Sequence, residues 1–198
     1  MRNILFSGNV KVFDGILTGM LSIFMRTKST EPYRIYIFTM DVSHLREDFL
    51  PVSDEQIAFL NEVAKSYNKE NIVIKIDMTD IYKEEFAGCP NEGAYCSPYT
   101  LLRLFADKIP EIPDKLLYLD ADILFNREPE LLYDIDVKGY EYAAARDHYG
   151  KYLINPNYIN AGVLLFNMAE IKKTGLFEKA RHLIKTKKLL FADQDAVY

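Results

Sequence analysis

Short apolar runs alternate along the chain with longer segments whose apolar residues recur at the helical period, and this alternation leaves few folds open. The predicted strands cover residues 3–7, 34–39, 72–76, 115–119, 142–145 and 162–166. The predicted helices cover residues 12–24, 53–67, 97–108 and 176–189. Strands that are apolar throughout are typical of parallel sheets, because helices cover both faces of such sheets. The order therefore predicts an α/β sandwich with parallel strands.

The composition excludes several classes of protein. The 198 residues are 49% hydrophobic and 27% charged, as in ordinary globular domains, and we expect a single domain over residues 1–198. The net charge of −5 argues against a nucleic-acid partner, since binding to the phosphate backbone needs a positive surface. No apolar run approaches the roughly 20 residues that cross a bilayer. The N-terminus turns polar too soon for a secretory signal, so we expect a cytoplasmic protein.

Two carboxylates follow a buried strand in Leu116-Leu117-Tyr118-Leu119-Asp120-Ala121-Asp122. The ligand crevice of an open α/β sheet lies outside the carboxyl ends of its strands, and alternate residues of an extended chain point the same way. Asp120 and Asp122 can therefore approach one cation together. Two such oxygen ligands beside a diphosphate suit Mg²⁺ or Mn²⁺. The alternative interpretation is a pair of aspartates that cap the next turn.

Two more polar segments lie downstream. Asn160 is followed by the small residues Ala161 and Gly162, which would let a ligand approach the backbone, although local chemistry alone favours a plain turn before a buried strand. Asp193-Gln194-Asp195 places three polar side chains in a row. Its alternative interpretation is a helix N-cap with acidic residues in the first turn.

Taken together and in this order, the three segments resemble the retaining glycosyltransferases of family 8, which include bacterial lipopolysaccharide galactosyl- and glucosyltransferases and the glycogenins. Ser97-Pro98-Tyr99-Thr100-Leu101-Leu102-Arg103 is similar to the family's helix that carries a donor-contacting arginine. The resemblance covers essentially the whole chain. It implies a GT-A (Rossmann-like) fold with a mixed, mainly parallel sheet between helices, a UDP-sugar donor, and a divalent cation, Mn²⁺ or Mg²⁺.

The resemblance assigns the donor-binding roles by position. Asp120 and Asp122 become the metal ligands, Asp120 also lies near the ribose of the donor, and Ala121 contacts the donor. Arg103 and Asp193 would hold hydroxyl groups of the donor sugar.

The remaining roles implied by the resemblance concern the transfer itself. Asn160 and Ala161 would line the pocket between donor and acceptor, with Gln194 beneath the anomeric carbon and Asp195 beside it. Transfer would take one step if Gln194 stabilises the developing positive charge, or two steps if Asp195 is the nucleophile. Both routes stay open from the sequence.

The nucleotide end departs from the family pattern. The family often carries an acidic pair followed by Asn-Tyr, which grips uracil and stacks on it, whereas this chain has Asn9-Val10-Lys11-Val12. We expect Ser7 and Asn9 to contact the nucleotide and Lys11 to reach a phosphate. The identity of the base stays open.

The family's third metal ligand is a histidine downstream of Asp-Gln-Asp, and the chain stops before that position. His44, His148 and His182 are expected to be ordinary side chains. We expect the chain to be a C-terminally truncated piece of a longer protein. Cys89 and Cys96 have no histidines nearby, which argues against a zinc site.

Two other functions compete with hexosyl transfer. Phosphohydrolases of the haloacid-dehalogenase type also place Asp-x-Asp after a strand, but they carry Thr or Val where Leu124 stands. A non-catalytic sugar-nucleotide-binding domain would accommodate Lys11 and Val12.

The segment 171–190 is strongly basic, with seven Lys or Arg and one Glu. It is either a solvated helix face or a surface for weak contact with an anionic membrane that presents a lipid-linked saccharide acceptor.

Overall fold

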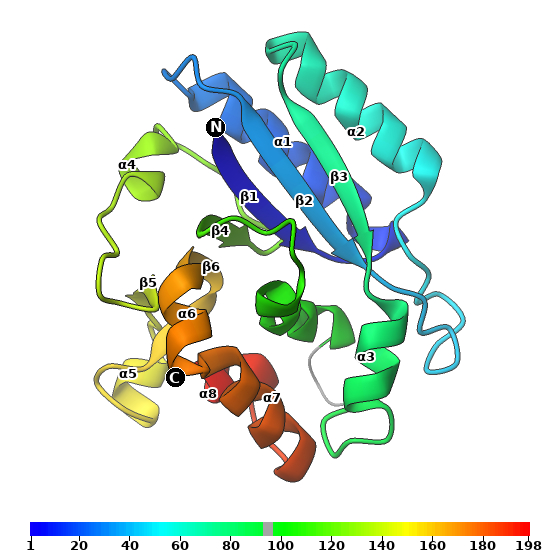
Figure 1. Cartoon of the computed structure of the whole chain (residues 1–198), viewed down its shortest axis with the longest axis vertical. Coiled ribbons are helices and arrows are strands. Elements are labelled where there is room, and N and C mark those ends of the chain that lie inside the picture. Colours follow the sequence, from blue (N-terminus) through cyan, green and yellow to red (C-terminus); the bar gives the residue numbers. More distant parts are fainter. Residues whose placement is uncertain (93–96) are drawn as a thin grey trace.

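In the computed structural model, which describes residues 1–92 and 97–198, one six-stranded sheet has the order β3-β2-β1-β4-β6-β5 (Figure 1). The strands are β1 (Arg2–Ser7), β2 (Tyr33–Thr39), β3 (Ile72–Asp77), β4 (Lys115–Leu119), β5 (Tyr142–Arg146) and β6 (Ile159–Asn167). The first four run parallel, whereas β6 is antiparallel to both β4 and β5. The predicted mixed, mainly parallel sheet is confirmed.

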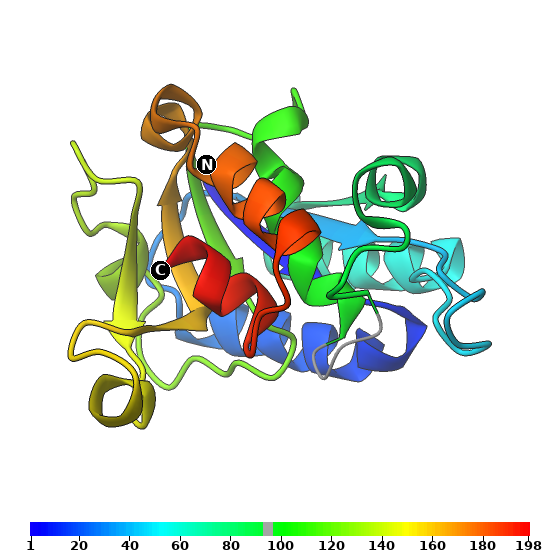
Figure 2. The same cartoon turned by 90° about the horizontal axis from the view of Figure 1, so that it is seen from below.

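Helices cover both faces of the sheet (Figures 1 and 2). One face packs against α1 (Phe13–Arg26), α2 (Asp54–Tyr67) and α4 (Glu130–Tyr133). The other packs against α3 (Thr79–Phe86), the 3₁₀ helix η2 (Pro98–Lys108), α6 (Met168–Thr174), α7 (Leu176–Thr186) and α8 (Ala192–Val197). The short helices η1 (Val10–Val12) and α5 (Gly150–Leu153) lie in connections. Alternate strand residues feed the two cores: Leu116 and Tyr118 face one, and Leu117 and Leu119 the other.

The order of the strands determines where a ligand can bind. β1 lies between β2 and β4, and Phe6 on β1 is in register with Leu119 on β4. The strands on either side of β1, β2 and β4, are reached by connections on opposite sides of β1. The carboxyl ends of β1 and β4 therefore lie side by side at a switch point of the sheet. Asn9 and Asp120 follow these two strand ends.

The start of α2 agrees with its sequence pattern. The Ser53 hydroxyl accepts a hydrogen bond from the N–H of Gln56 at 3.2 Å, and the Gln56 side chain accepts one from the N–H of Ser53 at 3.0 Å. This reciprocal pair is the predicted capping box.

Two boundaries lie three residues from those predicted, and the others lie within two residues. β6 begins at Ile159 instead of residue 162, so Asn160-Ala161-Gly162 is part of the strand and the plain-turn interpretation is wrong. Ile159 pairs with Arg146 on β5, and this partner keeps the backbone extended. α7 ends at Thr186 instead of residue 189. The side chain of the buried Asn91 donates to the carbonyls of Ile184 and Lys187, both at 2.6 Å, and so takes over the hydrogen bonds that end the helix.

The predicted helix at residues 97–108 is wound as a 3₁₀ helix. Side chains three residues apart are in line on such a helix, which puts Thr100 and Arg103 in one row. Among the described residues, none of the helices has the length and apolar character needed to cross a bilayer. Cys89 is a half-buried free thiol, and Cys96 lies outside the described residues.

Candidate active site

Asp120 and Asp122 lie where β4 leaves the sheet. The N–H of Asp120 donates to the carbonyl of Gly162 on β6 at 2.8 Å, and Asp120 Oδ1 accepts from the hydroxyl of Tyr118 at 2.6 Å. Asp122 is exposed. The turn after β4 is closed by a backbone bond from the N–H of Ile123 to the carbonyl of Asp120. The carboxylates themselves are therefore not needed to close that turn.

The guanidinium of Arg103 joins two of the predicted carboxylates in the interior. Arg103 is 1% exposed, and its Nη2 lies 3.1 Å from Asp120 Oδ1 and 3.2 Å from Asp193 Oδ2. Its Nη1 donates to the carbonyl of Ala161. Burial raises the pKa of the Asp193 carboxyl, and the Arg103 charge opposes that rise. One guanidinium thus faces two carboxylates, and Asp122 adds a third nearby, so the site has an excess of negative charge.

Two cavities meet at these carboxylates. Cavity 1, of about 430 Å³, and cavity 2, of about 310 Å³, share Thr100, Asp120 and Asp122 in their walls. Cavity 1 is otherwise lined by Ser7, Gly8, Asn9, Lys11, Val12, Gly15, Ser97, Tyr99, Tyr118 and Ala121. Cavity 2 is otherwise lined by Arg103, Ile123, Asn160, Ala161, Gly162, Phe191, Asp193 and Gln194. All predicted site residues except Asp195 therefore border one of the two cavities.

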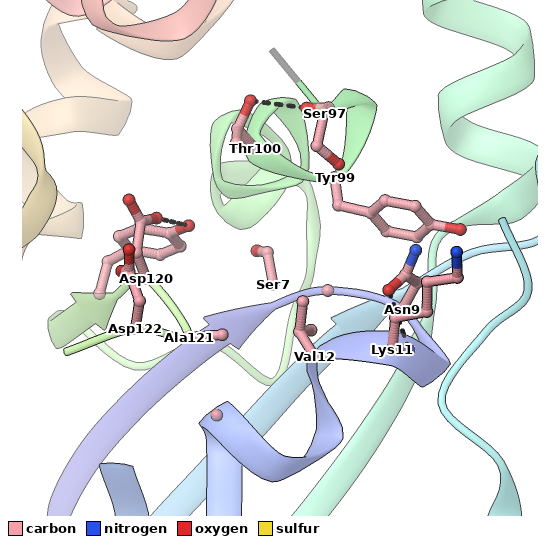
Figure 3. A pocket seen from close by; sticks show the side chains of 13 residues that line it. Ser7, Asn9, Lys11, Val12, Ser97, Tyr99, Thr100, Asp120, Ala121 and Asp122 are labelled. Carbon is pink, nitrogen blue, oxygen red and sulfur yellow. Dashed lines mark hydrogen bonds between the residues drawn. The ribbon is translucent and has the colours of Figure 1, made fainter. Parts of the chain in front are cut away.

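Cavity 1 extends from the carboxylates to the loop after β1. Figure 3 shows Asp120 and Asp122 at one end, and Asn9 and Lys11 with the ring of Tyr99 at the other. Asn9 Oδ1 accepts from the N–H of Lys11 at 3.1 Å and caps η1, and the Lys11 ammonium group pairs with Asp48. Asn9 and Lys11, which are predicted to contact the nucleotide and its phosphate, therefore already make hydrogen bonds and ion pairs with other residues of the protein.

The start of β6 forms a wall of cavity 2. The N–H of Ala161 donates to Gln194 Oε1 at 3.1 Å, and the Asn160 side chain donates to Asp147 at 3.4 Å. A Cβ atom on Gly162 would lie 3.0 Å from Asp120 Oδ2, so the missing side chain leaves that oxygen accessible.

Sequence reasoning missed Tyr118, which lines cavity 1, and Asp147, which borders neither cavity but accepts from Asn160 in the wall of cavity 2. The N–H of Gly150, helped by Asn160, Tyr149 and Gln194, holds the pKa of the Asp147 carboxyl below its ordinary value. Asp147 directly follows β5, which is the signal that would have found it. Tyr118 reads as an ordinary core residue of a strand, and only the folded structure brings its hydroxyl to Asp120.

Asp193 and Asp195 have different surroundings although both lie in the first turns of α8. The N-cap of this helix is Phe191, without a side-chain capping bond, and Asp193 is turned inward and 5% exposed. Asp193 is therefore not the N-cap, although it lies in the first turn, as the alternative interpretation expected of these acidic residues. Asp195 Oδ2, in contrast, accepts from the N–H groups of Leu190 at 3.1 Å and Phe191 at 2.9 Å.

The side chains of the site allow a metal site formed by two carboxylates and oxygens of the substrate and water. Within residues 1–92 and 97–198, no three or more His, Cys, Asp or Glu side chains are grouped to hold a metal. His44, His148 and His182 border neither cavity 1 nor cavity 2. Asp120 and Asp122 fit a hard divalent cation that takes its other ligands from substrate oxygens and water.

A mixed α/β sheet with paired carboxylates at its switch point is compatible with the fold of a glycosyltransferase domain. The chain matches the model of glycosyl transferase family 8 over residues 22–198. It belongs to this family. The phosphohydrolase alternative is thereby excluded.

Curated relatives agree with this assignment. The chain is 28% identical, over 81% of its length, to a putative glycosyltransferase of Haemophilus influenzae, and 31% identical, over 90% of its length, to glycosyltransferase GlyA of Streptococcus pneumoniae. It spans 47% and 22% of the lengths of these two relatives.

Solved structures show the same fold. An active-site mutant of LgtC superposes with a TM-score of 0.79 at 21% identity, covering 99% of this chain and 69% of that one. LgtC in complex with donor and acceptor sugar analogues gives a TM-score of 0.76 at 22% identity, with the same coverage of both chains. GlyE of Streptococcus pneumoniae gives 0.67 at 21% identity and covers 99% of this chain and 42% of that one. The predicted GT-A fold is confirmed.

Proposed function

We propose that this chain is the catalytic core of a retaining hexosyltransferase that moves glucose or galactose from a UDP-sugar to a saccharide or glycolipid acceptor. The observation that carries the proposal is the meeting of cavities 1 and 2 at Asp120 and Asp122. A nucleoside in cavity 1 and a hexose in cavity 2 would put the diphosphate beside these two carboxylates.

The hydroxyl of Ser7 supports cavity 1 as the nucleotide site. It borders the cavity, is buried, and has no hydrogen-bond partner among the described residues. Buried polar atoms in proteins nearly always find a partner. A polar group of a bound nucleotide would supply one.

The negative charge of the site suits a divalent cation, Mn²⁺ or Mg²⁺, held by Asp120 and Asp122. Such a cation would offset the charge that develops on the departing nucleoside diphosphate. Arg103 keeps Asp120 in place through Oδ1, which leaves Oδ2 for a ligand. Gly162 keeps that oxygen uncovered.

Gln194 and Asp193 would act on the hexose in cavity 2. The Gln194 amide oxygen accepts one hydrogen bond from Ala161, and such an oxygen can accept a second contact. It would face the positive charge that develops at the anomeric carbon, while Asp193 holds sugar hydroxyls. In the one-step route the acceptor hydroxyl attacks on the leaving-group face and gives its proton to the departing phosphate. The two-step route through Asp195 is the alternative.

We also propose a cytoplasmic location with weak contact at an anionic membrane, where a lipid-linked saccharide would be the acceptor. Lys172, Lys173, Lys179 and Lys185 on α6 and α7 are all exposed. Exposed lysines near a membrane surface attract anionic lipids.

Release of nucleoside diphosphate from a panel of UDP-sugars, with and without Mn²⁺, tests the proposal in the complete protein. We expect one UDP-hexose to be turned over, and only with the cation present. Asp122→Asn is expected to lower turnover by about 10²-fold or more, because charge-stabilising groups have effects of this size. Asp136→Asn is the matched control, since Asp136 is exposed and borders neither cavity.

A non-catalytic sugar-nucleotide-binding domain is the second candidate, favoured by Lys11 and Val12 at the nucleotide end. It predicts calorimetric binding of a UDP-sugar without turnover under any metal condition. Absence of binding for every UDP-sugar would contradict both candidates.

A further inference from the structure

The short helix α8 carries two site residues but has little of its own to hold it in place. It has six residues, and the side chain of its N-cap residue, Phe191, makes no capping hydrogen bond. A helix of this length is not stable by itself in water. Asp193 and Gln194 border cavity 2 from its first turn, so whatever fixes this turn also aims these two side chains.

The contacts of Asp195 fix the start of α8. Its Oδ2 accepts from the N–H groups of Leu190 and of the N-cap residue Phe191, which ties the first turn of the helix to the segment that leads into it. Its Oδ1 accepts from the hydroxyl of Tyr158, which directly precedes β6. Both oxygens are therefore occupied, and Asp195 is not among the described residues that line cavity 2.

Tyr158 is itself held tightly. It is 1% exposed, and its ring packs against that of Tyr198 with the centroids 5.1 Å apart. A Cβ atom on Gly150 of α5 would lie 2.2 Å from the Tyr158 ring, so glycine is required beneath it. Burial, together with the Asp195 carboxylate, raises the pKa of the Tyr158 phenol, and its hydroxyl stays a donor.

We propose that Tyr158 is a positioning residue of this site, which acts through Asp195 to set α8 against β6 and so aims Gln194 and Asp193 into cavity 2. The strand holds the helix at a second point, where the N–H of Ala161 donates to Gln194. Residues 158 and 161 are about 10 Å apart along an extended chain, so the two contacts set the direction of α8 along β6, in addition to the ion pair that Asp193 makes with Arg103. The same geometry assigns Asp195 to the helix start and favours the one-step route. The inference rests on the proposed function.

Steady-state kinetics of Tyr158→Phe in the complete protein test the proposal. We expect kcat to fall about tenfold while the affinity for UDP stays within about twofold, because the lost hydrogen bond to a carboxylate affects the aim of Gln194 and Asp193 and not the nucleotide site. Tyr142→Phe is the matched control. The Tyr142 hydroxyl also donates to α8, but to the carbonyl of Val197 at 2.9 Å, at the end away from the first turn. Equal losses of kcat in both variants would overturn the proposal.

Asp195→Asn separates positioning from chemistry. We expect its kcat to fall about as far as that of Tyr158→Phe, and the double variant to lose no more than either single one, because both changes act on one contact. A loss of about 10⁴-fold in Asp195→Asn, beside near-wild-type kcat in Tyr158→Phe, would overturn the proposal and identify Asp195 as the nucleophile.

Amide hydrogen exchange gives a readout that needs no activity. Tyr158→Phe should speed exchange of the Phe191 and Ala161 N–H groups about tenfold, whereas Tyr142→Phe should leave both unchanged. Unchanged exchange in Tyr158→Phe would overturn the positioning role. If Tyr158→Phe shows the expected faster exchange but the wild-type protein transfers no sugar, the result would support the positioning role and contradict only the proposed function.

Discussion

At the residue scale, the missing side chain of Gly162 keeps an oxygen of Asp120 accessible to a ligand. Gly162 lies inside β6, where its backbone does not need glycine's conformational freedom. An added Cβ atom would lie 3.0 Å from Asp120 Oδ2 and 3.2 Å from Asn160 Oδ1. Tyr118 and Arg103 hold Asp120 from the other side, so the carboxylate has little room to retreat.

We therefore expect Gly162→Ala to weaken Mn²⁺-dependent UDP binding by roughly tenfold or more, as changes around metal ligands do. Calorimetric titration of UDP with and without Mn²⁺ measures this. Gly139→Ala is the contrasting control: Gly139 has a φ of +80° and open space around it, so the change strains the backbone far from the site. That variant should lose about 1 kcal/mol of unfolding free energy and keep its UDP affinity. Unchanged affinity in Gly162→Ala would show that Asp120 Oδ2 is not used by the ligand.

At the scale of single elements, the start of α2 connects stability with the nucleotide site. Ser53 and Gln56 form the capping box, and Gln56 Nε2 also donates to the carbonyl of Val10 at 3.3 Å. Val10 belongs to η1, between Asn9 and Lys11. One side chain thus serves both the helix start and the loop that borders cavity 1.

The two residues of the box should therefore differ when replaced. Ser53→Ala should cost about 1 kcal/mol of unfolding free energy and leave UDP affinity unchanged, because only the cap is lost. Gln56→Ala should cost a similar amount and in addition lower UDP affinity by a few-fold, since the loop after β1 loses a support. Urea unfolding and calorimetry on both variants measure the two effects. Equal UDP affinities would show that the Val10 contact does not support the loop.

At the scale of the whole molecule, carboxylates held by ion pairs and by hydrogen bonds make stability depend on pH. The Arg2 guanidinium at the start of β1 hydrogen-bonds Asp134, which directly follows α4, and holds the pKa of that carboxyl below its ordinary value. The pKa is lowered in the same direction in a set of further carboxyls spread over the chain: Glu31, Asp41, Asp48, Glu55, Glu85, Glu128, Glu130 and Asp147. Burial raises the pKa of Asp193, which acts in the opposite direction.

A carboxyl with a lowered folded-state pKa contributes stability above its unfolded pKa, and this contribution is lost as pH falls through the folded value. We expect the urea midpoint to be level near neutral pH and to fall steadily below about pH 4, where unfolded carboxyls bind protons. Asp193 takes up its proton more readily in the folded state and offsets a small part of that loss. Asp134→Asn should lower the midpoint at neutral pH and flatten its fall in acid. A midpoint that rises on acidification would contradict the assignment of these ion pairs and hydrogen bonds.

Local pattern in the sequence determined the six strands, four of the helices and the place of the carboxylate pair, whereas α3, α4, α5 and α6 were not predicted. Apolar runs gave the strands, Ser53 and Gln56 marked the start of α2, and a buried run before Asp120 predicted a site at the end of β4. These features depend on residues close together in the chain, because side-chain periodicity and helix capping are local properties. The family resemblance added the meaning of the motifs taken together, in an order that extends over the whole chain.

Only the tertiary structure decided how the site is assembled. Arg103 lies between Asp120 and Asp193, Tyr118 supports Asp120, and Tyr158 reaches Asp195, although each pair except Tyr118 and Asp120 is far apart in the sequence. The packing of η2 and α8 against the sheet brings these groups together, and no local period records which side chains will meet. Packing also extended β6 back to Ile159 and ended α7 at Thr186. The physical reason is the same in each case: a buried polar group needs a partner, and the partner is supplied by whichever distant segment the fold places beside it.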